Sequence, residues 1–139
     1  MTERKKTINV QEGGHRHTSP IPQGVKAGGF IFLSALRGVN PETQRVEHDD
    51  VEAQSRQLFA NLTRALAAAG ATLDDVVKIG VYMKDLKDRA VFNKVWSEHF
   101  GQKAPARFAV QVVDLGIPGD KSRVLIEVTA LAPSDTERG

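Results

Sequence analysis

The sequence predicts an α+β domain in which two helices cover one face of a single mixed β-sheet. Segments with strand and helix character follow one another in the order β, β, α, β, α, β, β. Both helical segments are amphipathic, so together they can cover only one sheet face. The chain has 139 residues and no internal linker, so we expect one domain over residues 1–139, in which a polar segment (1–19) precedes the core.

Five segments have the length and composition of strands. They are residues 7–10, 29–35, 76–83, 105–113 and 123–130. A turn over 40–44, with Val39 and Val46 on either side, predicts a loose hairpin after the second strand. Residues 133–139 are polar and predict a flexible tail, so the core is expected to span residues 20–132.

Two segments have helical periodicity. The first begins at Asp49, where Glu52 three residues later gives a capping-box arrangement, and it ends at Gly70. Its apolar stripe consists of Leu58, Phe59, Leu62, Leu66 and Ala69. The second covers residues 88–100, with an inward face made of Val91, Phe92, Val95, Trp96 and Phe100. We expect both stripes to belong to the hydrophobic core.

The composition excludes several classes of protein and site. The chain has no cysteine, which excludes disulfides, thiolate metal sites and a cysteine nucleophile. A net charge of +2, 6% aromatic residues and the lack of a basic run interleaved with aromatics argue against nucleic-acid binding. No apolar stretch approaches the roughly 20 residues that span a bilayer, and the charged start is not a secretory signal. We therefore expect a cytoplasmic protein without membrane contact.

The last two predicted strands each carry a charged residue opposite an apolar face. Strand side chains alternate, so Arg107 and Glu127 each lie on the less apolar face of their strand. The apolar faces are Phe108, Val110 and Val112 in one strand and Val124, Ile126 and Val128 in the other. If the strands are neighbours, Arg107 can bind an anion while Glu127 handles a proton in the same pocket. The alternative is a cross-strand salt bridge.

The sheet face that the helices leave uncovered is expected to be of mixed polarity. It would carry Arg107, Gln111, Leu125, Glu127 and Thr129. This set is too polar for a core and too apolar for open water, so we expect a symmetric oligomer that buries the face.

Other polar residues have weaker claims to a function. His15 and His17 have the spacing of a metal pair, but no third ligand is evident and a surface loop is the alternative, so we expect no metal site. Ser34 lies at a strand end without a supporting His and Asp pattern, which favours a hydrogen-bonding role over a nucleophile. His48 and His99 are isolated and are expected to be solvated.

Seven short motifs, taken in order, resemble the RidA/YjgF family of reactive-intermediate deaminases. They are residues 23–28, 32–34, 40–43, 74–78, 93–96, 105–107 (Pro-Ala-Arg) and 126–128 (Ile-Glu-Val). The resemblance implies a chorismate-mutase-like α+β fold and a homotrimer with active sites between subunits. It also implies hydrolysis of enamines or imines such as 2-aminoacrylate to keto acids and ammonia, without a metal or organic cofactor. The family roles fall on Arg107 for the substrate carboxylate, Glu127 for the attacking water and Ser34 for the pocket.

The chain departs from the family pattern around the expected pocket. Ile21 stands where a tyrosine is usual, and Ala109 where a cysteine is frequent. Arg89 replaces a pocket-lining aromatic residue, and Arg37 lies in a loop where a Gly-Gln pair is typical. Each arginine can be a solvated surface charge. We hypothesise instead that Arg89 binds a second anionic group, which would suit an aminomuconate-like dicarboxylate.

Three functions therefore compete at this point. The first is a cofactor-independent deaminase whose substrate-binding residues are Arg107, Ser34, Ala109, Arg89 and Ile21. The second is a non-catalytic trimer that uses Arg107 to bind keto acids. The third is an RNA-directed, endoribonuclease-like activity, against which the small net charge argues.

Overall fold

The structure is a computed structural model, which describes residues 4–9 and 20–133. Its strands are β1 (Lys5–Ile8), β2 (Gly24–Ala27), β3 (Phe30–Leu36), β4 (Val76–Met83), β5 (Ala106–Gln111) and β6 (Val124–Leu131). Its α-helices are α1 (Val51–Ala68) and α2 (Arg89–Phe100), and the 3-10 turns η1 (Leu73–Asp75) and η2 (Leu86–Asp88) precede β4 and α2.

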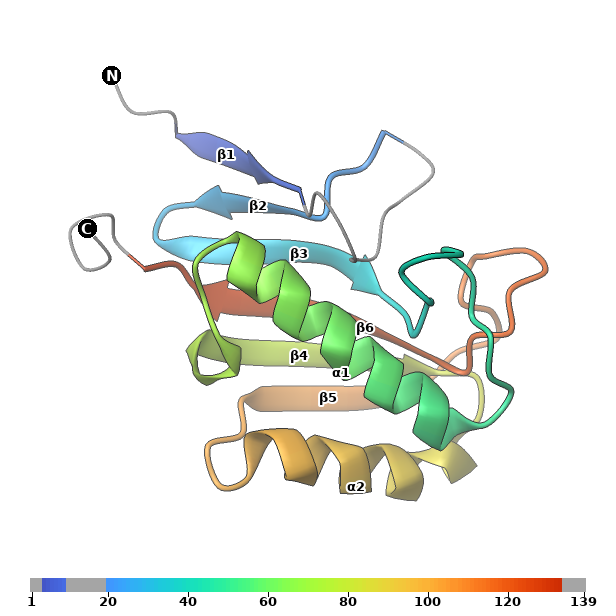
Figure 1. The fold of residues 1–139 in the computed structure, drawn as a ribbon. Coiled ribbons are helices and arrows are strands. Elements are labelled where there is room, and N and C mark those ends of the chain that lie inside the picture. Colours follow the sequence, from blue (N-terminus) through green and yellow to red (C-terminus); the bar gives the residue numbers. More distant parts are fainter. Residues whose placement is uncertain (1–3, 10–19, 134–139) are drawn as a thin grey trace.

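The six strands form one sheet in the order β1-β2-β3-β6-β4-β5. Neighbouring strands are antiparallel except for β4 and β5, which are parallel, so the sheet is mixed. α1 crosses the sheet and α2 lies along the edge strand β5 (Figure 1). This arrangement confirms the predicted α+β class, with two helices on one face of a mixed sheet.

The N-terminal part of the sheet differs from the prediction. The strand expected over 7–10 lies at Lys5–Ile8, and Val10 falls outside the described residues. β2 was not predicted, because four residues are too few for periodicity to indicate a strand. It pairs with β3 through Gly28 and Gly29, whose φ angles of 58° and 84° suit glycine in a tight hairpin.

The loose hairpin expected around residues 40–44 is not formed. The turn is present, since Asn40 and Arg45 are joined by a backbone hydrogen bond of 2.7 Å, but no strands flank it. Instead, Val39 is buried and the Nδ2 atom of Asn61 on α1 donates to the carbonyls of Arg37 and Val39 at 3.0 and 2.9 Å. A helix side chain thus satisfies backbone groups that a strand partner would otherwise satisfy.

The first helix begins one residue later than predicted. Asp50 is its N-cap, and the Asp50 carboxylate accepts a hydrogen bond from the Ala53 N–H at 2.9 Å. Glu52 does not complete a capping box, because with Asp50 as the N-cap it occupies the second helical position instead of the third; its carboxylate pairs with Arg56 at 3.2 Å. At the other end, Gly70 has a φ of 80° and ends the helix as expected.

The sheet face beneath the helices forms the hydrophobic core. Its buried strand residues include Ile31, Leu33, Ile79, Val81, Ile126 and Val128. The predicted stripes of both helices pack against them, and all of the stripe residues are buried except Val91, which is partly buried. The prediction that Phe92 and Trp96 are core residues is confirmed.

The opposite sheet face exposes a group of large apolar side chains. Between 38% and 47% of the surface is exposed in each of Phe30, Phe32, Phe108, Val110 and Leu131. Large apolar side chains exposed together on a sheet face commonly mark a protein interface. It supports the expected oligomer, which stays a prediction.

Candidate active site

Arg107 lies on the helix-covered side of the edge strand β5. It pairs in register with Ile79 of β4, whose side chain is fully buried under the helices. The Arg107 Cζ atom is 4.8 Å from the centroid of the Trp96 ring and 5.7 Å from that of Phe92. The guanidinium therefore rests on two aromatic rings of α2 and is partly shielded from water.

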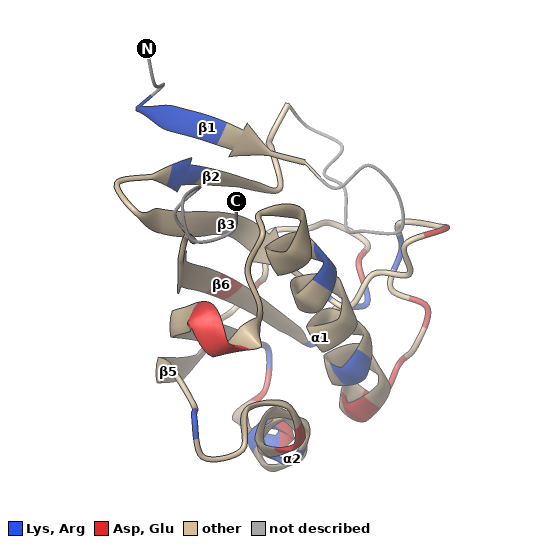
Figure 2. Ribbon diagram, turned by 60° about the vertical axis from the view of Figure 1, so that its left-hand side comes forward, with Lys and Arg blue, Asp and Glu red and all other residues tan. Residues whose placement is uncertain are grey.

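Glu127 lies on the other side of the sheet. It pairs with Gly80 of β4, and its side chain is exposed on the uncovered face. In Figure 2, β6 carries this acidic position on a strand that is otherwise uncharged. Because β4 lies between β5 and β6, Arg107 and Glu127 occupy neither adjacent strands nor the same face.

The prediction that Arg107 and Glu127 share a pocket depended on their strands being neighbours, and within one chain this condition is not met. The alternation along each strand was predicted correctly, but β5 turns its apolar side outward: Phe108 and Val110 are exposed. The alternative salt bridge is also absent, and no carboxylate in residues 4–9 and 20–133 forms an ion pair with Arg107. One chain alone does not bring the two residues together.

A β-bulge places Ser34 beside Glu127. Leu33 pairs with Val128 and Leu36 with Ile126, so Ser34 and Ala35 together stand opposite the single residue Glu127. The Ser34 hydroxyl donates to the Pro22 carbonyl at 2.8 Å, which ties the segment containing the exposed Ile21 to this position. In this state the serine has the hydrogen-bonding role that the sequence favoured.

Gly80 provides room for an aromatic ring next to Glu127. A Cβ atom added at Gly80 would lie only 2.5 Å from the Cζ atom of Phe108. The Phe108 ring thus covers the glycine, and Tyr82 meets the same ring edge-on with 5.6 Å between centroids. The surroundings of Glu127 on the uncovered face are consequently apolar on one side and hydrogen-bonded on the other.

The first turn of α2 adds a second positive charge near Arg107. One face of α2 carries the residues three, four and seven positions after Arg89, which are Phe92, Asn93 and Trp96. Burial lowers the pKa of Arg107, and the charge of Arg89 lowers this pKa further. The guanidinium keeps its charge, because arginine does not lose its proton in proteins.

Asn93 is a polar residue on this helix face to which the sequence analysis gave no role. Its Oδ1 atom is buried, and no described residue donates a hydrogen bond to it. Ala109 follows Arg107 on the same side of β5 and packs against the core, so a small residue there leaves the area around the guanidinium unfilled by a longer side chain.

Comparison with known proteins identifies the family. A family model described as Endoribonuclease L-PSP matches residues 16–133. A RutC family protein of Pyrococcus horikoshii is 39% identical over 127 residues, which cover 91% of this chain and 97% of that protein. The crystal structure of RidA from an Antarctic Psychrobacter superposes with a TM-score of 0.82 at 34% identity, over 91% of this chain and 98% of that one. The chain belongs to the RidA/YjgF family.

Family membership supports a RidA-type role, and the deaminase class is supported at the level of the family. A relative from Arabidopsis thaliana named Reactive Intermediate Deaminase A, chloroplastic, is 33% identical over 111 residues; they cover 80% of this chain and 59% of that protein. The family model and a structural relative from Thermotoga maritima carry the name endoribonuclease instead. These names belong to the relatives and do not fix the substrate of this chain.

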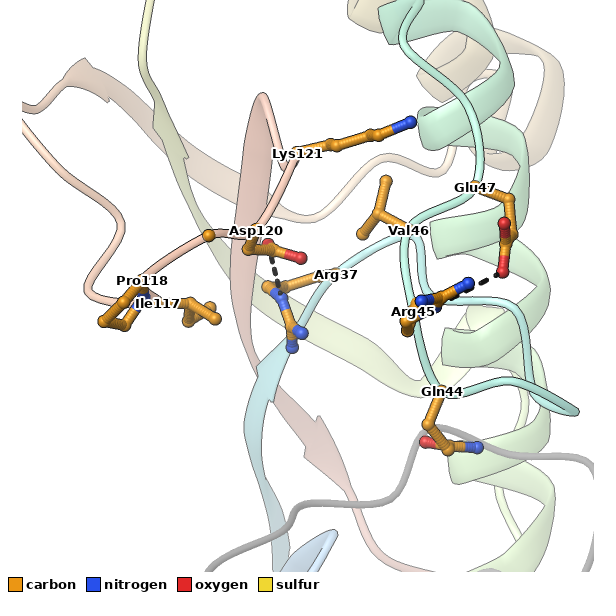
Figure 3. Close-up of a pocket in the computed structure, with 10 residues that line it drawn as sticks. Arg37, Gln44, Arg45, Val46, Glu47, Ile117, Pro118, Asp120 and Lys121 are labelled. Carbon is orange, nitrogen blue, oxygen red and sulfur yellow. Dashed lines mark hydrogen bonds and ion pairs between the residues drawn. The ribbon is translucent and has the colours of Figure 1, made fainter.

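Arg37, the other family departure with a charge, lies away from the arginine pair. It lines a hollow of about 450 Å³ between the loops around residues 44–47 and 117–121 (Figure 3). Its Nε atom donates to Asp120 at 3.1 Å. Burial would raise the pKa of Asp120, but hydrogen bonds from Ser122 and the charge and hydrogen bond of Arg37 outweigh it and lower that pKa.

The charges around this hollow are balanced in pairs. Besides Arg37 and Asp120, Arg45 lies 3.9 Å from Glu47, and Lys121 lies 3.4 Å from Asp49 outside the hollow. Among its described lining residues, the hollow therefore has no unpaired cation comparable to Arg107.

The histidines do not form a metal site in the described part of the chain. His15 and His17 fall within residues 10–19, outside the described residues, and the rest of the structure contains no group of three residues that could hold a metal ion. His99 is exposed, as expected. The prediction that it is isolated is wrong, because its ring stacks on that of Phe59 with 4.4 Å between the ring centroids.

The expected cytoplasmic location stays a prediction. Neither α1 nor α2, the α-helices of the described residues, is long and apolar enough to cross a bilayer. Relatives in the family are named chloroplastic and mitochondrial, so the family as a whole is not confined to one compartment.

Proposed function

We propose that this protein is a cofactor-independent hydrolytic deaminase of small carboxylated enamines or imines, which it converts to keto acids and ammonia. The observation that carries the proposal is the state of Arg107, which is charged, partly buried on aromatic rings and not paired with any described carboxylate. A cation in that state is suited to bind an anionic ligand. The relative named Reactive Intermediate Deaminase A supports the reaction class.

Arg107 would bind the carboxylate of the substrate. A guanidinium is planar and can donate two parallel N–H bonds to a carboxylate, which fixes the ligand's orientation as well as its position. The adjacent imine carbon is then held at a constant place, where water can attack it.

Glu127 would act on that water from a neighbouring protomer. Within one chain the two side chains lie on opposite sheet faces, and β5, which carries Arg107, is an edge strand open to another molecule. The uncovered face with Phe32, Phe108 and Val110 supports association through the side that carries Glu127. We therefore propose a homotrimer whose active sites lie between subunits.

The reaction then proceeds in three balanced steps. Protonation of the enamine at its terminal carbon gives an iminium ion with an electrophilic carbon. Water adds to this carbon and transfers a proton to Glu127, which forms a carbinolamine. The carbon–nitrogen bond breaks after the proton passes from Glu127 to nitrogen. Ammonia leaves as the carbonyl of the keto acid forms, and the hydroxyl proton returns to water, which replaces the proton taken up in the first step. Proton transfer by a positioned carboxylate accelerates such steps by about 10²–10⁴-fold.

Arg89 would set the substrate preference. Its charge acts on Arg107, and no ion pair of Arg89 with a described carboxylate is present. Two neighbouring cations favour a ligand with two anionic groups, such as a 2-aminomuconate-like dicarboxylate, over a monocarboxylate such as 2-aminoacrylate. Both substrates belong in the test.

A non-catalytic keto-acid-binding trimer is the second candidate, because the same unpaired Arg107 supports it. The two candidates differ in turnover. Ammonia release from enzymatically generated 2-aminoacrylate and 2-aminomuconate should be accelerated by the wild-type protein and lost in Arg107→Ala. Binding of pyruvate without accelerated ammonia release from either substrate would favour the binding trimer.

A further inference from the structure

We propose that Trp96 is a positioning residue that holds the guanidinium of Arg107 in the orientation required for carboxylate binding. The inference rests on the proposed role of Arg107 as the anion-binding group. It assigns a function to a side chain that the sequence analysis treated only as part of the core. The observation behind it is the 4.8 Å distance between the Arg107 Cζ atom and the Trp96 ring centroid.

An arginine side chain needs a partner to stay in one conformation. Its four rotatable bonds carry a large rotamer entropy, which is lost when a ligand must order it. Arginine is usually held by a carboxylate, but within the described residues no carboxylate contacts Arg107. The rings of Trp96 and Phe92 are the groups recorded against its guanidinium there.

An aromatic partner orients the cation without neutralising it. A carboxylate partner would occupy the N–H donors of Arg107 and would compete with the substrate carboxylate for the same positions. An indole face attracts the positive charge through its ring electrons and leaves the in-plane N–H donors free. Trp96 can therefore fix the guanidinium and still leave it available to an anion.

Trp96 is itself fixed by other rings. Only 7% of its surface is exposed. Its ring centroid lies 4.7 Å from that of Phe100, 6.1 Å from Phe92 and 6.4 Å from Phe59. Because these neighbours are buried, the indole cannot move away without disturbing the core, and it provides a rigid support for Arg107.

The first experiment compares two substitutions that each remove one buried ring of the same aromatic cluster but differ at Arg107. Trp96→Leu removes the ring against Arg107, whereas Phe100→Leu removes an equally buried ring of the same cluster, for which no contact with the guanidinium is recorded. Pyruvate affinity, measured by calorimetry on the full-length protein, should fall about 2- to 30-fold in Trp96→Leu, the range of a cation–π contact. It should be nearly unchanged in Phe100→Leu.

The conservative variant and the kinetics separate positioning from packing. Trp96→Phe keeps an aromatic face and should retain most of the affinity. For turnover, Trp96→Leu should raise KM more than it lowers kcat, because it disorders a binding group. Equal losses in Trp96→Leu and Phe100→Leu, or a Trp96→Phe variant as impaired as Trp96→Leu, would overturn the proposal.

Fluorescence gives a readout that needs no folded Trp96 variant. Trp96 is the only tryptophan in the chain, so its emission reports directly on the contact with Arg107. Pyruvate should change this emission in the wild type and leave it unchanged in Arg107→Met. Emission that does not respond to pyruvate in a wild-type protein that binds it through Arg107 would contradict the proposal.

These measurements distinguish the inference from the proposed function. If pyruvate binds through Arg107 and Trp96→Leu weakens it, but no ammonia is released from either imine, the deaminase assignment fails and the positioning role stands. If ammonia release is normal and the affinity of Trp96→Leu equals that of the wild type, the positioning role fails and the deaminase assignment stands.

Discussion

Gln54 offers a sharp test of how the loops beside α1 are held. It lies on α1 with 1% of its surface exposed. Its Nε2 atom donates to the carbonyls of His48 and Lys121 at 2.8 and 3.1 Å, and its Oε1 atom accepts from the Arg123 N–H at 2.8 Å. One side chain thus joins α1 to the loop before it and to the segment that leads into β6.

Gln54→Ala removes three hydrogen bonds to the backbone at once. Each is worth about 1 kcal/mol net, so we expect a destabilisation of about 3 kcal/mol. For a chain of this size, the melting temperature should fall by about 10 °C. Gln57→Ala is the matched control, since Gln57 lies on the same helix and makes one recorded side-chain bond, to Asn61 at 3.0 Å.

Urea unfolding followed by Trp96 fluorescence measures both variants. Protein concentration must be the same in each experiment, because association of subunits adds to the apparent stability. The difference in helix propensity between glutamine and alanine is common to the two variants and cancels. A loss in Gln54→Ala no larger than that in Gln57→Ala would refute the reasoning.

Three further outcomes are expected. Arg89→Ala should lower kcat/KM for the dicarboxylate imine more than for the monocarboxylate; an unchanged ratio would show that Arg89 does not contact substrate. Val110→Lys places a charge on the uncovered sheet face and should reduce the oligomer mass measured by light scattering, whereas an unchanged mass would place the interface elsewhere. Asp120→Asn should destabilise the protein at pH 7. Because the folded-state pKa of Asp120 is depressed, the difference in unfolding free energy between wild type and variant should be full above the ordinary pKa of 3.8 and should shrink as the pH falls through the folded-state pKa. A difference that does not change with pH would show that Arg37 does not stabilise the carboxylate.

Helical periodicity predicted the elements that carry the core. The stripes of α1 and α2 repeat over three or more turns, so Phe59, Leu62 and Trp96 could be placed inside from the sequence. β2 could not, because its four residues are recognisable only through pairing with β3. Periodic signals need length, and short strands lack it.

The candidate site shows a second limit of sequence analysis. Alternation assigned Arg107 and Phe108 to opposite faces correctly, but it could not show which face turns toward the helices. The assumption that the apolar face turns inward fails on β5, because Phe108 and Val110 lie on the uncovered face of an edge strand. An apolar strand face can pack against the core of its own chain or against a second molecule, and the hydrophobic pattern of one chain does not distinguish the two.

The orphaned Asn93 oxygen was also beyond the sequence. The sequence shows that residue 93 is an asparagine in the second helix. That its oxygen has no hydrogen-bond partner follows only from how the side chains pack.

The most direct test of the account mixes two inactive variants. Arg107→Ala and Glu127→Gln are co-expressed at equal levels and purified as mixed oligomers, and ammonia release is measured. If each site takes Arg107 from one subunit and Glu127 from another, about a quarter of the sites are complete, and about a quarter of the wild-type activity should return. If mixed oligomers form and activity stays at the level of the separate variants, Arg107 and Glu127 do not act in one site between subunits, and the proposed mechanism is wrong.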